Sequence, residues 1–476
     1  MGVCTTILAM SRGPIFVLAP DRFPRGTSRL TTASIRGCRR LCGLSTLMVA
    51  LSSPVAPARA DGERLRLNLK DEHADGADLW IYNDIEKTRA KARRQKKPLF
   101  VTFRCVPCKA CAGFDAAVAR GSRIIENLVR EKFVSVHQVE MKGVDLTLFQ
   151  FDYDLNWAAM FLNADGVVYA RYGTQSAAGP DAYNSISGLE KTMRRVLKLH
   201  EVYPKNAGEL DGKRGARKPY KTALEMPGLR DKEDYRRRTT RKNGIHCHNV
   251  HDAEQAQAQN AGTLTRLRPD LLWRHPLPEN LGLTIDRDEG VRIATLRPGS
   301  PAQRVGLEAG ESVTHVSDQA ITSIADIQWA LHHLPSGDAL VKVRGSKTGV
   351  HALKVDAGWK RTDVSWRGSM GSLSPRLRVC APALNEDKRR AHGIPEQQAA
   401  FLVKWINAET AGGRSARDAG LRHGDIVVEL EGKHLQKMTP QQFQLHIKLR
   451  YKVGDELRLT VLRDGQRRPV IVRLVE

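Results

Sequence analysis

The stretch Phe103-Arg104-Cys105-Val106-Pro107-Cys108-Lys109-Ala110-Cys111 decides the fold, because it spaces three cysteines three residues apart behind the apolar run Pro98–Phe103. On a helix, each step of three residues turns the sulfur by about 60°, so all three sulfurs share one side. A strand that leads into such a helix presents Cys105 near the helix N-terminus. The macrodipole and the free N–H groups there favour the thiolate, which is the reactive form of cysteine.

The first 60 residues have the composition of a targeting segment. They hold eight arginines and one acidic residue, and they run through the apolar stretch Leu41–Leu51 into Ala58-Arg59-Ala60. This is the pattern of a secretory signal peptide with a small-residue cleavage site. The apolar core is too short to span a bilayer, and no later stretch reaches about 20 apolar residues. We therefore expect a signal peptide over residues 1–60, a leader over 61–78, and a periplasmic or secreted bacterial protein without a transmembrane segment in its mature chain.

The chain is strongly basic. Its 476 residues carry a net charge of +24, of which about +17 remains after the first 60 residues are removed. Such a charge favours anionic partners. The sequence nevertheless contains no zinc finger, no aromatic-rich RNA-binding motif and no recognition helix. We expect a solvated basic surface and no nucleic-acid partner.

Cysteine usage points to specialised sulfur chemistry. The expected mature chain keeps an odd number of cysteines, which are Cys105, Cys108, Cys111, Cys247 and Cys380. An odd count in an oxidising compartment argues against a framework held together by disulfides.

Residues 79–203 have the pattern of an α/β domain built around the cysteine stretch. Apolar periodicity and turn residues predict, in order, a helix over 79–97, the strand, the cysteine helix, a helix over 124–129, a strand over 133–139, a hairpin of 159–163 and 167–172 around Asp165-Gly166, and a helix over 189–200.

This order of elements, the Cys105-Val106-Pro107-Cys108 motif behind a strand and the Asp-Gly hairpin resemble the thioredoxin superfamily. The resemblance implies an α/β/α sandwich with Cys105 as nucleophile and Cys108 as resolving thiol. Two residues depart from the family pattern, since Arg104 stands where redox members carry tryptophan and Ala158 stands where they carry a cis-proline. The third cysteine, Cys111, is a further candidate catalytic thiol, a ligand of a soft metal, or a small buried residue.

Residues 204–278 are expected to be a basic linker, because charge runs such as Lys213–Lys218 are most often solvated. Within them, Gly244-Ile245-His246-Cys247-His248 matches the haem c motif Cys-x-x-Cys-His, except that Gly244 replaces the first cysteine. Three alternatives remain open: haem c held by one thioether with His248 as axial ligand, another transition metal bound by His246, Cys247, His248 and His251, or a His-rich loop without a ligand.

The C-terminal half repeats one pattern. A first repeat over 279–358 and a second over 393–476, separated by a connector over 359–392, each contain a Gly-Leu turn, a strand, a helix and a closing hairpin. Both resemble PDZ domains of the bacterial periplasmic-protease type. In the first repeat, the resemblance implies that Gly282, Leu283, Thr284 and Ile285 bind a protein terminus or an extended peptide. In the second, the nearest candidate loop is Gly393-Ile394-Pro395, where Pro395 removes a donor.

Together the sequence predicts a multidomain chain, with a thioredoxin-like domain followed by two PDZ-type β-barrel/α domains. This order resembles exported planctomycete-type proteins. We expect a thiol-redox or electron-transfer protein with a redox partner protein, whose PDZ modules recruit further partners. The alternative is a non-enzymatic adaptor whose cysteines are structural or bind metal or haem. A protease is excluded, because no Gly-x-Ser-x-Gly or His-Glu-x-x-His motif is present.

Overall fold

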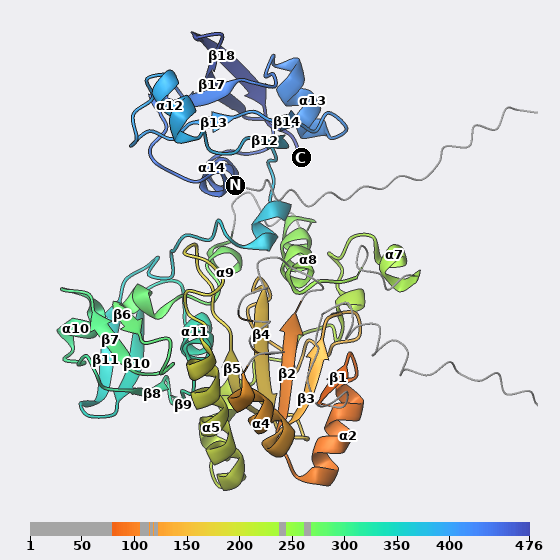
Figure 1. Cartoon of the computed structure of the whole chain (residues 1–476), viewed down its shortest axis with the longest axis vertical. Helices are drawn as coiled ribbons and strands as arrows, with labels where there is room; N and C mark the ends of the chain where they lie inside the picture. Colours follow the sequence, from red (N-terminus) through yellow and green to blue (C-terminus); the bar gives the residue numbers. More distant parts are fainter. Residues whose placement is uncertain (1–78, 105–113, 115–117, 119–121, 238–243, 261–267) are drawn as a thin grey trace, which may run out of the picture. The chain divides into compact units, whose positions relative to one another are not determined.

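The computed structural model describes residues 79–104, 114, 118, 122–237, 244–260 and 268–476 (Figure 1). The expected signal peptide and leader lie outside the described residues, and so do Cys105, Cys108 and Cys111. Within the described ranges, no helix has both the length and the apolar character needed to cross a membrane.

A five-stranded mixed sheet forms the centre of the N-terminal domain. Its spatial order is β1-β3-β2-β4-β5, with β1 and β2 parallel to β3 and with β4 antiparallel to β2 and β5. The strands are β1 (Trp80–Tyr82), β2 (Leu99–Arg104), β3 (Val134–Gln138), β4 (Trp157–Leu162) and β5 (Val168–Tyr172). All six residues of β2 are buried. The strand expected ahead of the cysteines is therefore confirmed as the central strand.

Helices cover both faces of this sheet. Successive side chains of β2 point to opposite faces, so each face has its own apolar cluster. Leu99, Val101 and Phe103 face a cluster that includes residues of α2 (Ile85–Gln95) and α8 (Cys247–Asn260). Phe100 faces the other cluster, which includes residues of α4 (Arg123–Lys132) and α5 (Ile186–Val202). The expected α/β/α layering is present in the described residues (Figure 1).

The helix expected over residues 79–97 divides into β1 and α2, so the prediction is wrong for residues 79–84. Asn83 adopts a positive φ of 51° between the two elements. The Asp84 side chain then accepts a hydrogen bond from the Lys87 N–H at 2.9 Å and caps α2. Trp80 and Ile81 pair with β3 instead of continuing a helical face.

The segment over 204–278, expected to be a solvated linker, is folded onto the N-terminal domain. Its described elements are α6 (Ala207–Leu210), the 3-10 turns η2 (Asp211–Lys213) and η3 (Ala223–Glu225), α7 (Lys232–Arg237), α8 and α9 (Pro269–Leu272). Tyr220, Met226, Ile245 and Val250 enter the same apolar cluster as β2. Lys213, taken as part of a solvated charge run, is only 1% exposed. Lys213 can be buried because it forms an ion pair with the buried carboxylate of Asp326.

The first repeat has its own apolar core of 18 buried residues, so it forms a packed unit. Two sheets, β6-β7 and β11-β10-β8-β9, enclose this core. Its elements are η4 (Pro278–Leu281), β6 (Leu283–Ile285), β7 (Ile293–Leu296), α10 (Pro301–Arg304), β8 (Val313–Val316), β9 (Gln319–Ala320), α11 (Ile324–His332), β10 (Ala339–Gly345) and β11 (Gly349–Val355).

The second repeat begins earlier than the sequence indicates. The strand β12 (Val379–Cys380) lies in the expected connector but pairs with β14 (Trp405–Ile406) of the second repeat. The remaining elements of the connector and repeat are η5 (Gly368–Ser372), α12 (Glu386–Ala391), β13 (Phe401–Leu402), α13 (Ala411–Asp418), β15 (Ile426–Leu430), β16 (Lys433–His434), α14 (Pro440–Arg450), β17 (Glu456–Arg463) and β18 (Gln466–Arg473).

A buried charge cluster joins the thioredoxin-like domain to the first repeat. Asp326 of α11 accepts hydrogen bonds from Lys213 Nζ at 2.7 Å and from the backbone N–H of Arg171 in β5 at 3.0 Å. Both partners of the ion pair are 1–2% exposed. The Arg171 guanidinium lies 3.4 Å above the ring centre of Trp329, also in α11. Burial lowers the pKa of Arg171 to about 9.

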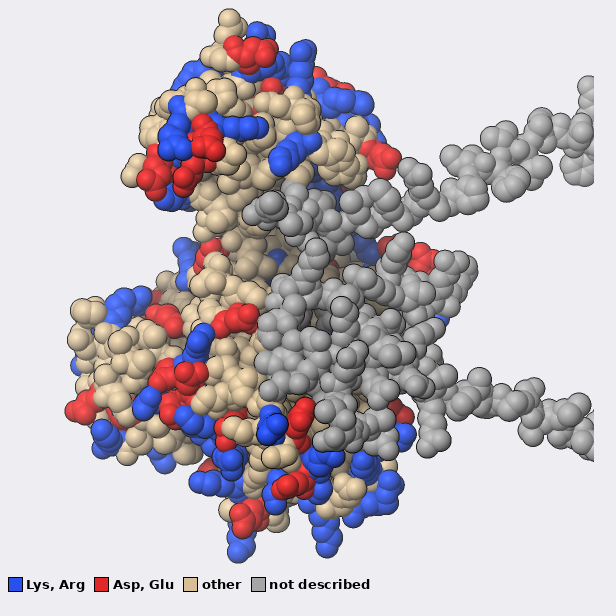
Figure 2. Space-filling model, viewed as in Figure 1, with Lys and Arg blue, Asp and Glu red and all other residues tan. Residues whose placement is uncertain are grey.

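The described surface mixes charges of both signs. Figure 2 shows Lys and Arg side chains interspersed with Asp and Glu on the face drawn. No single-sign basic stripe of the kind used to follow a nucleic-acid backbone is visible on the described part of that face.

Candidate functional site

The candidate redox site begins where β2 ends. Arg104 is the last residue of this central strand and directly precedes Cys105 in the sequence. Its partner across the sheet is Trp157, and Phe103 pairs with Ala158. Ala158, which the resemblance assigns to the family's cis-proline position, therefore lies beside the strand end that leads into the cysteine motif. Cys105, Cys108 and Cys111 themselves remain sequence predictions.

A buried polar cluster lies beneath this strand end. Thr102 Oγ1 is 2.5 Å from His137 Nδ1, and Arg104 Nη1 is 3.4 Å from His137 Nε2. The Trp80 ring stacks on His137 with 3.6 Å between ring centres. Arg104 is 4% exposed, so its positive charge acts in a medium of low dielectric constant.

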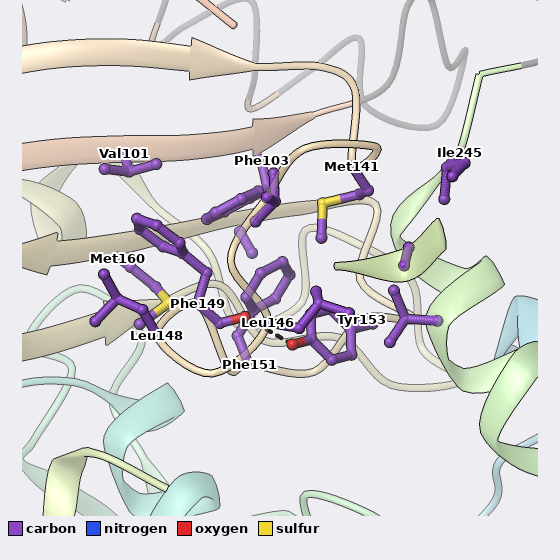
Figure 3. Packing of buried hydrophobic residues seen from close by; sticks show 14 of the residues in the cluster. Val101, Phe103, Met141, Leu146, Leu148, Phe149, Phe151, Tyr153, Met160 and Ile245 are labelled. Atoms are coloured by element: carbon purple, nitrogen blue, oxygen red, sulfur yellow. Dashed lines mark hydrogen bonds between the residues drawn. The ribbon is translucent and has the colours of Figure 1, made fainter. Parts of the chain in front are cut away.

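The Gly244–His248 segment is attached at the same edge of the sheet. The Ile245 N–H donates to the Glu140 carboxylate at 3.0 Å, and the Ile245 carbonyl accepts from the Met141 N–H at 3.0 Å. Glu140 and Met141 follow the carboxyl end of β3, which is the neighbour of β2. Figure 3 shows the Met141 side chain between Phe103 and Ile245. The second cysteine-bearing motif is therefore held close to the strand end that precedes the first.

Cys247 opens helix α8 as a partly buried residue. Its side chain packs against the apolar cluster of the thioredoxin-like domain. The rings of His246 and His248 stack with centres 5.8 Å apart and planes within 4°. A thiol packed against protein in this way fits a core or redox cysteine better than the anchor of a haem.

His251, the remaining candidate ligand, belongs to a different cluster. His251 Nδ1 lies 2.8 Å from Asp154 Oδ2, and Ser369 donates to Asp154 from both its N–H and its hydroxyl at 2.8 Å. Arg367 makes a two-pronged contact with Asp152 at 2.6 and 2.8 Å. Burial lowers the pKa of His251 in spite of Asp154. Although burial opposes it, the contacts with His251 and Arg367 hold the pKa of Asp154 well below its usual range.

The same cluster resembles a metal site in its donors, because Asp152, Asp154 and His251 offer ligand atoms within 4.8 Å of one another. The Arg367 guanidinium already satisfies both oxygens of Asp152 and contacts Asp154 at 3.3 Å. It places a positive charge where a cation would bind. The residues present therefore do not fit a metal, and the cluster acts as an internal ion-pair network.

The first repeat places its expected peptide-binding residues at the start of β6. Gly282 has a φ of +87°, and an added Cβ would lie 2.1 Å from Ser300 Cβ, so this turn requires glycine. The Gly282 N–H donates to the Glu279 carbonyl at 3.0 Å. Leu283 and Ile285 are buried and Thr284 is exposed. A peptide carboxylate would therefore depend on donors other than the Gly282 N–H.

The equivalent loop of the second repeat is Leu377-Arg378-Val379, and not the expected Gly393-Ile394-Pro395. Arg378 has a φ of +53° and precedes a strand, as Gly282 does. Its carbonyl accepts from the Asn407 N–H at 3.0 Å, just as the Gly282 carbonyl accepts from Arg297 at 2.9 Å. Sequence reasoning missed this loop because an arginine occupies a left-handed position that glycine normally fills.

The family comparison agrees with the N-terminal part of this geometry. Residues 80–164 match a family model described as thioredoxin-like. The matched range contains β1 to β4, Arg104, all three cysteines of the motif and Ala158. The chain thus contains a thioredoxin-like domain.

The curated relatives that match part of this chain are serine proteases of the DegP and HtrA type. The chain is 29% identical over 172 residues to a probable periplasmic serine endoprotease DegP-like of Halomonas elongata, covering 36% of this chain and 34% of that protein. It is 24% identical over 185 residues to the serine protease Do-like HtrA of Lactobacillus helveticus, covering 35% and 42%. The chain therefore spans about a third to two-fifths of the length of these relatives.

Solved structures of HtrA-type proteases resemble this chain only weakly. A serine-to-alanine variant of the HtrA-type protease AlgW, with a decapeptide, matches at 17% identity over 28% of this chain and 37% of that one, with a TM-score of 0.19. AlgW with a decapeptide matches at 13% identity over 30% and 51%, also with a TM-score of 0.19.

Two stacked histidines make stability sensitive to acid. The rings of His275 and His332 stack with centres 4.2 Å apart, and burial lowers the pKa of both well below 6.5. Their folded forms stay neutral while the unfolded chain takes up protons below pH about 6.5, so the free energy of unfolding falls as the pH drops. We expect a loss of about 1 kcal/mol per histidine between about pH 7 and pH 5.5.

Urea unfolding at the two pH values measures this loss. His332→Gln should reduce the pH-dependent difference by about one histidine's share. An unchanged difference in this variant would contradict the assignment to His332.

Proposed function

We propose that this protein is an exported thiol-redox protein in which Cys105 and Cys108 exchange electrons with a partner protein and the C-terminal repeats act as PDZ modules. The observation that carries the proposal is the match of residues 80–164 to a thioredoxin-like model, with the central strand β2 ending directly before Cys105 in the sequence. Export is supported by the signal-like first 60 residues and by relatives described as periplasmic.

The exchange follows ordinary thiol–disulfide chemistry. The Cys105 thiolate attacks one sulfur of the partner's disulfide, and the other partner sulfur leaves as a thiolate that takes up a proton. The Cys108 thiolate then attacks Cys105 in the mixed disulfide, which releases the reduced partner and leaves a Cys105–Cys108 disulfide. The N-terminus of the helix expected at Cys105 would favour the attacking thiolate.

In this proposal, the first repeat binds the partner protein by PDZ-type recognition. The first repeat would add an extended peptide to the edge of β6 through Gly282, Leu283, Thr284 and Ile285. Among the described strands β6 pairs with β7 alone, so its other edge carries no strand. An edge of this kind supports strand addition as the mode of recognition, because it presents backbone groups in the ladder direction.

Thiol substitutions test the redox proposal. With mature protein and a glutathionylated model peptide, Cys105→Ser should lower the second-order reduction rate at least 100-fold, because serine does not attack sulfur. Cys108→Ser should instead trap a mixed disulfide on Cys105, visible by mass spectrometry. Cys111→Ser is the matched control on the same motif, and it should retain the rate if Cys108 resolves Cys105.

The adaptor alternative predicts a different result. If glutathione buffers from reducing to oxidising never form a Cys105–Cys108 disulfide, the redox proposal is wrong and the cysteines are structural. A visible spectrum of the same sample tests the haem c hypothesis for Cys247 and His248. A Soret band that disappears in Cys247→Ala would support a single thioether, and a band that persists would exclude it.

A further inference from the structure

The groove of the first repeat is in contact with a segment of the thioredoxin-like domain. In a PDZ-type fold, a peptide lies between the strand β6 and the helix α11. The segment over residues 173–185, which connects β5 to α5 and is called here the β5–α5 segment, contacts α11 and the loop that follows β6. It is a described part of the chain.

The contacts of this segment lie at α11 and at the loop after β6. On the helix side, Thr174 Oγ1 donates to Gln328 Oε1 of α11 at 2.8 Å. Beyond the end of β6, the Ser185 hydroxyl donates to the Arg287 carbonyl at 3.3 Å, and Arg287 Nη1 donates to the Asp181 carbonyl at 3.4 Å. The segment therefore bridges α11 and the loop that follows β6.

Helix α5 continues the contact without a gap. An added Cβ on Gly188 would lie 2.3 Å from the Arg287 carbonyl oxygen, so the helix backbone and this loop are in direct contact. Lys191 Nζ forms an ion pair with Glu289 at 2.5 Å, and Arg195 donates to the Thr322 carbonyl at 3.2 Å. The β6–β7 loop is thereby fixed against α5.

Tyr183 is the apolar element of this segment. Its ring packs against the core cluster of the first repeat, which contains Leu281, Leu283 and Ile285. Its hydroxyl interacts with Glu279 in the turn before β6, and burial followed by this carboxylate raises the pKa of Tyr183 to about 12. An aromatic ring beside the turn that precedes β6 occupies the position where a peptide's terminal side chain would be expected.

We propose that the peptide groove of the first repeat is closed by the β5–α5 segment of its own chain, with Tyr183 in place of a ligand side chain. A peptide binds there only after this segment moves away. The proposal rests on the peptide-binding function proposed above, and it makes that function conditional on a rearrangement of the thioredoxin-like domain.

The test uses the full mature chain and its variants. The probe is a fluorescein-labelled pool of decapeptides ending in free Val, Leu or Phe, with binding measured by anisotropy. Hydrogen exchange of residues 281–286, read by mass spectrometry with and without the pool, locates the binding. Tyr183→Ala and Tyr183→Ala/Lys191→Glu should open the groove, and Lys198→Glu is the matched control, since Lys198 is exposed on the same helix.

We expect slow exchange over 281–286 in the wild type and in Lys198→Glu. The opened variants should exchange at least tenfold faster and bind the pool at least tenfold more tightly, with renewed protection of β6. Faster exchange without binding would support closure and refute the peptide-binding function. Wild-type binding at β6 equal to that of the opened variants, or unchanged exchange in both of them, would overturn the proposal.

Discussion

Replacing Arg367 with methionine is expected to lower the free energy of unfolding by about 3–5 kcal/mol. The substitution places an apolar side chain at this position and removes the guanidinium that binds both oxygens of Asp152 and contacts Asp154. Asp152 and Asp154 are each 6% exposed. Their charges would face each other without this compensating cation, and water could not replace it at low cost. Guanidinium unfolding followed by tryptophan fluorescence measures the loss.

The matched control is Arg390→Met. Arg390 pairs with Asp387 at 2.7 Å, but both side chains are more than three-quarters exposed, so little change is expected. A double variant, Arg367→Met/Asp152→Leu, should recover part of the loss because it removes one of the unpaired charges. Equal effects of Arg367→Met and Arg390→Met would show that burial of this network does not decide its contribution.

Lys213→Met is expected to cause a loss of similar size, about 3–5 kcal/mol, because it leaves Asp326 buried without its cation. Burial lowers the pKa of Lys213, and Asp326 opposes this shift. Asp326 would keep only its neutral donors, which include the backbone N–H groups of Arg171 and Thr322. The same unfolding experiment applies, and the loss should appear in the transition of the thioredoxin-like domain together with the first repeat.

Lys437→Met is the corresponding exposed case. Lys437 and Glu396 lie 3.1 Å apart with side chains 71% and 80% exposed, so their pair contributes little. Lys213→Met/Asp326→Asn should be less destabilising than the sum of the two single variants, since the pair is removed together. Strict additivity would indicate that Lys213 stabilises the protein without Asp326.

Local patterns in the sequence predict the parts of the fold that depend on neighbouring residues. The apolar run before Cys105 predicts β2, and Asp165-Gly166 predicts the turn between β4 and β5, where Gly166 has a φ of +90°. The helix over 189–200 is found as Ile186–Val202. These elements follow from periodicity and turn chemistry, which require no knowledge of distant partners.

Buried charges could not be found in this way. Lys213 and Asp326 are 113 residues apart in the sequence, and Arg367 and Asp152 are 215 apart. A lysine in a basic run or an arginine in a connector has the same local pattern whether it is solvated or paired, because only the tertiary partner decides. Arg378 is a similar case, since its left-handed backbone is set by the strand that follows it.

Helix α11 bears on where one folding unit ends and another begins. All eight residues Ile324–Leu331 are buried, some against the core of the first repeat and others against β5 of the thioredoxin-like domain and η2 of the segment that follows it. Neither sequence module encloses this helix alone. A chain cut between residues 203 and 279 would expose Arg171 on one fragment and Trp329 on the other. We therefore expect the thioredoxin-like domain and the first repeat to unfold together, although the sequence divides them into two modules.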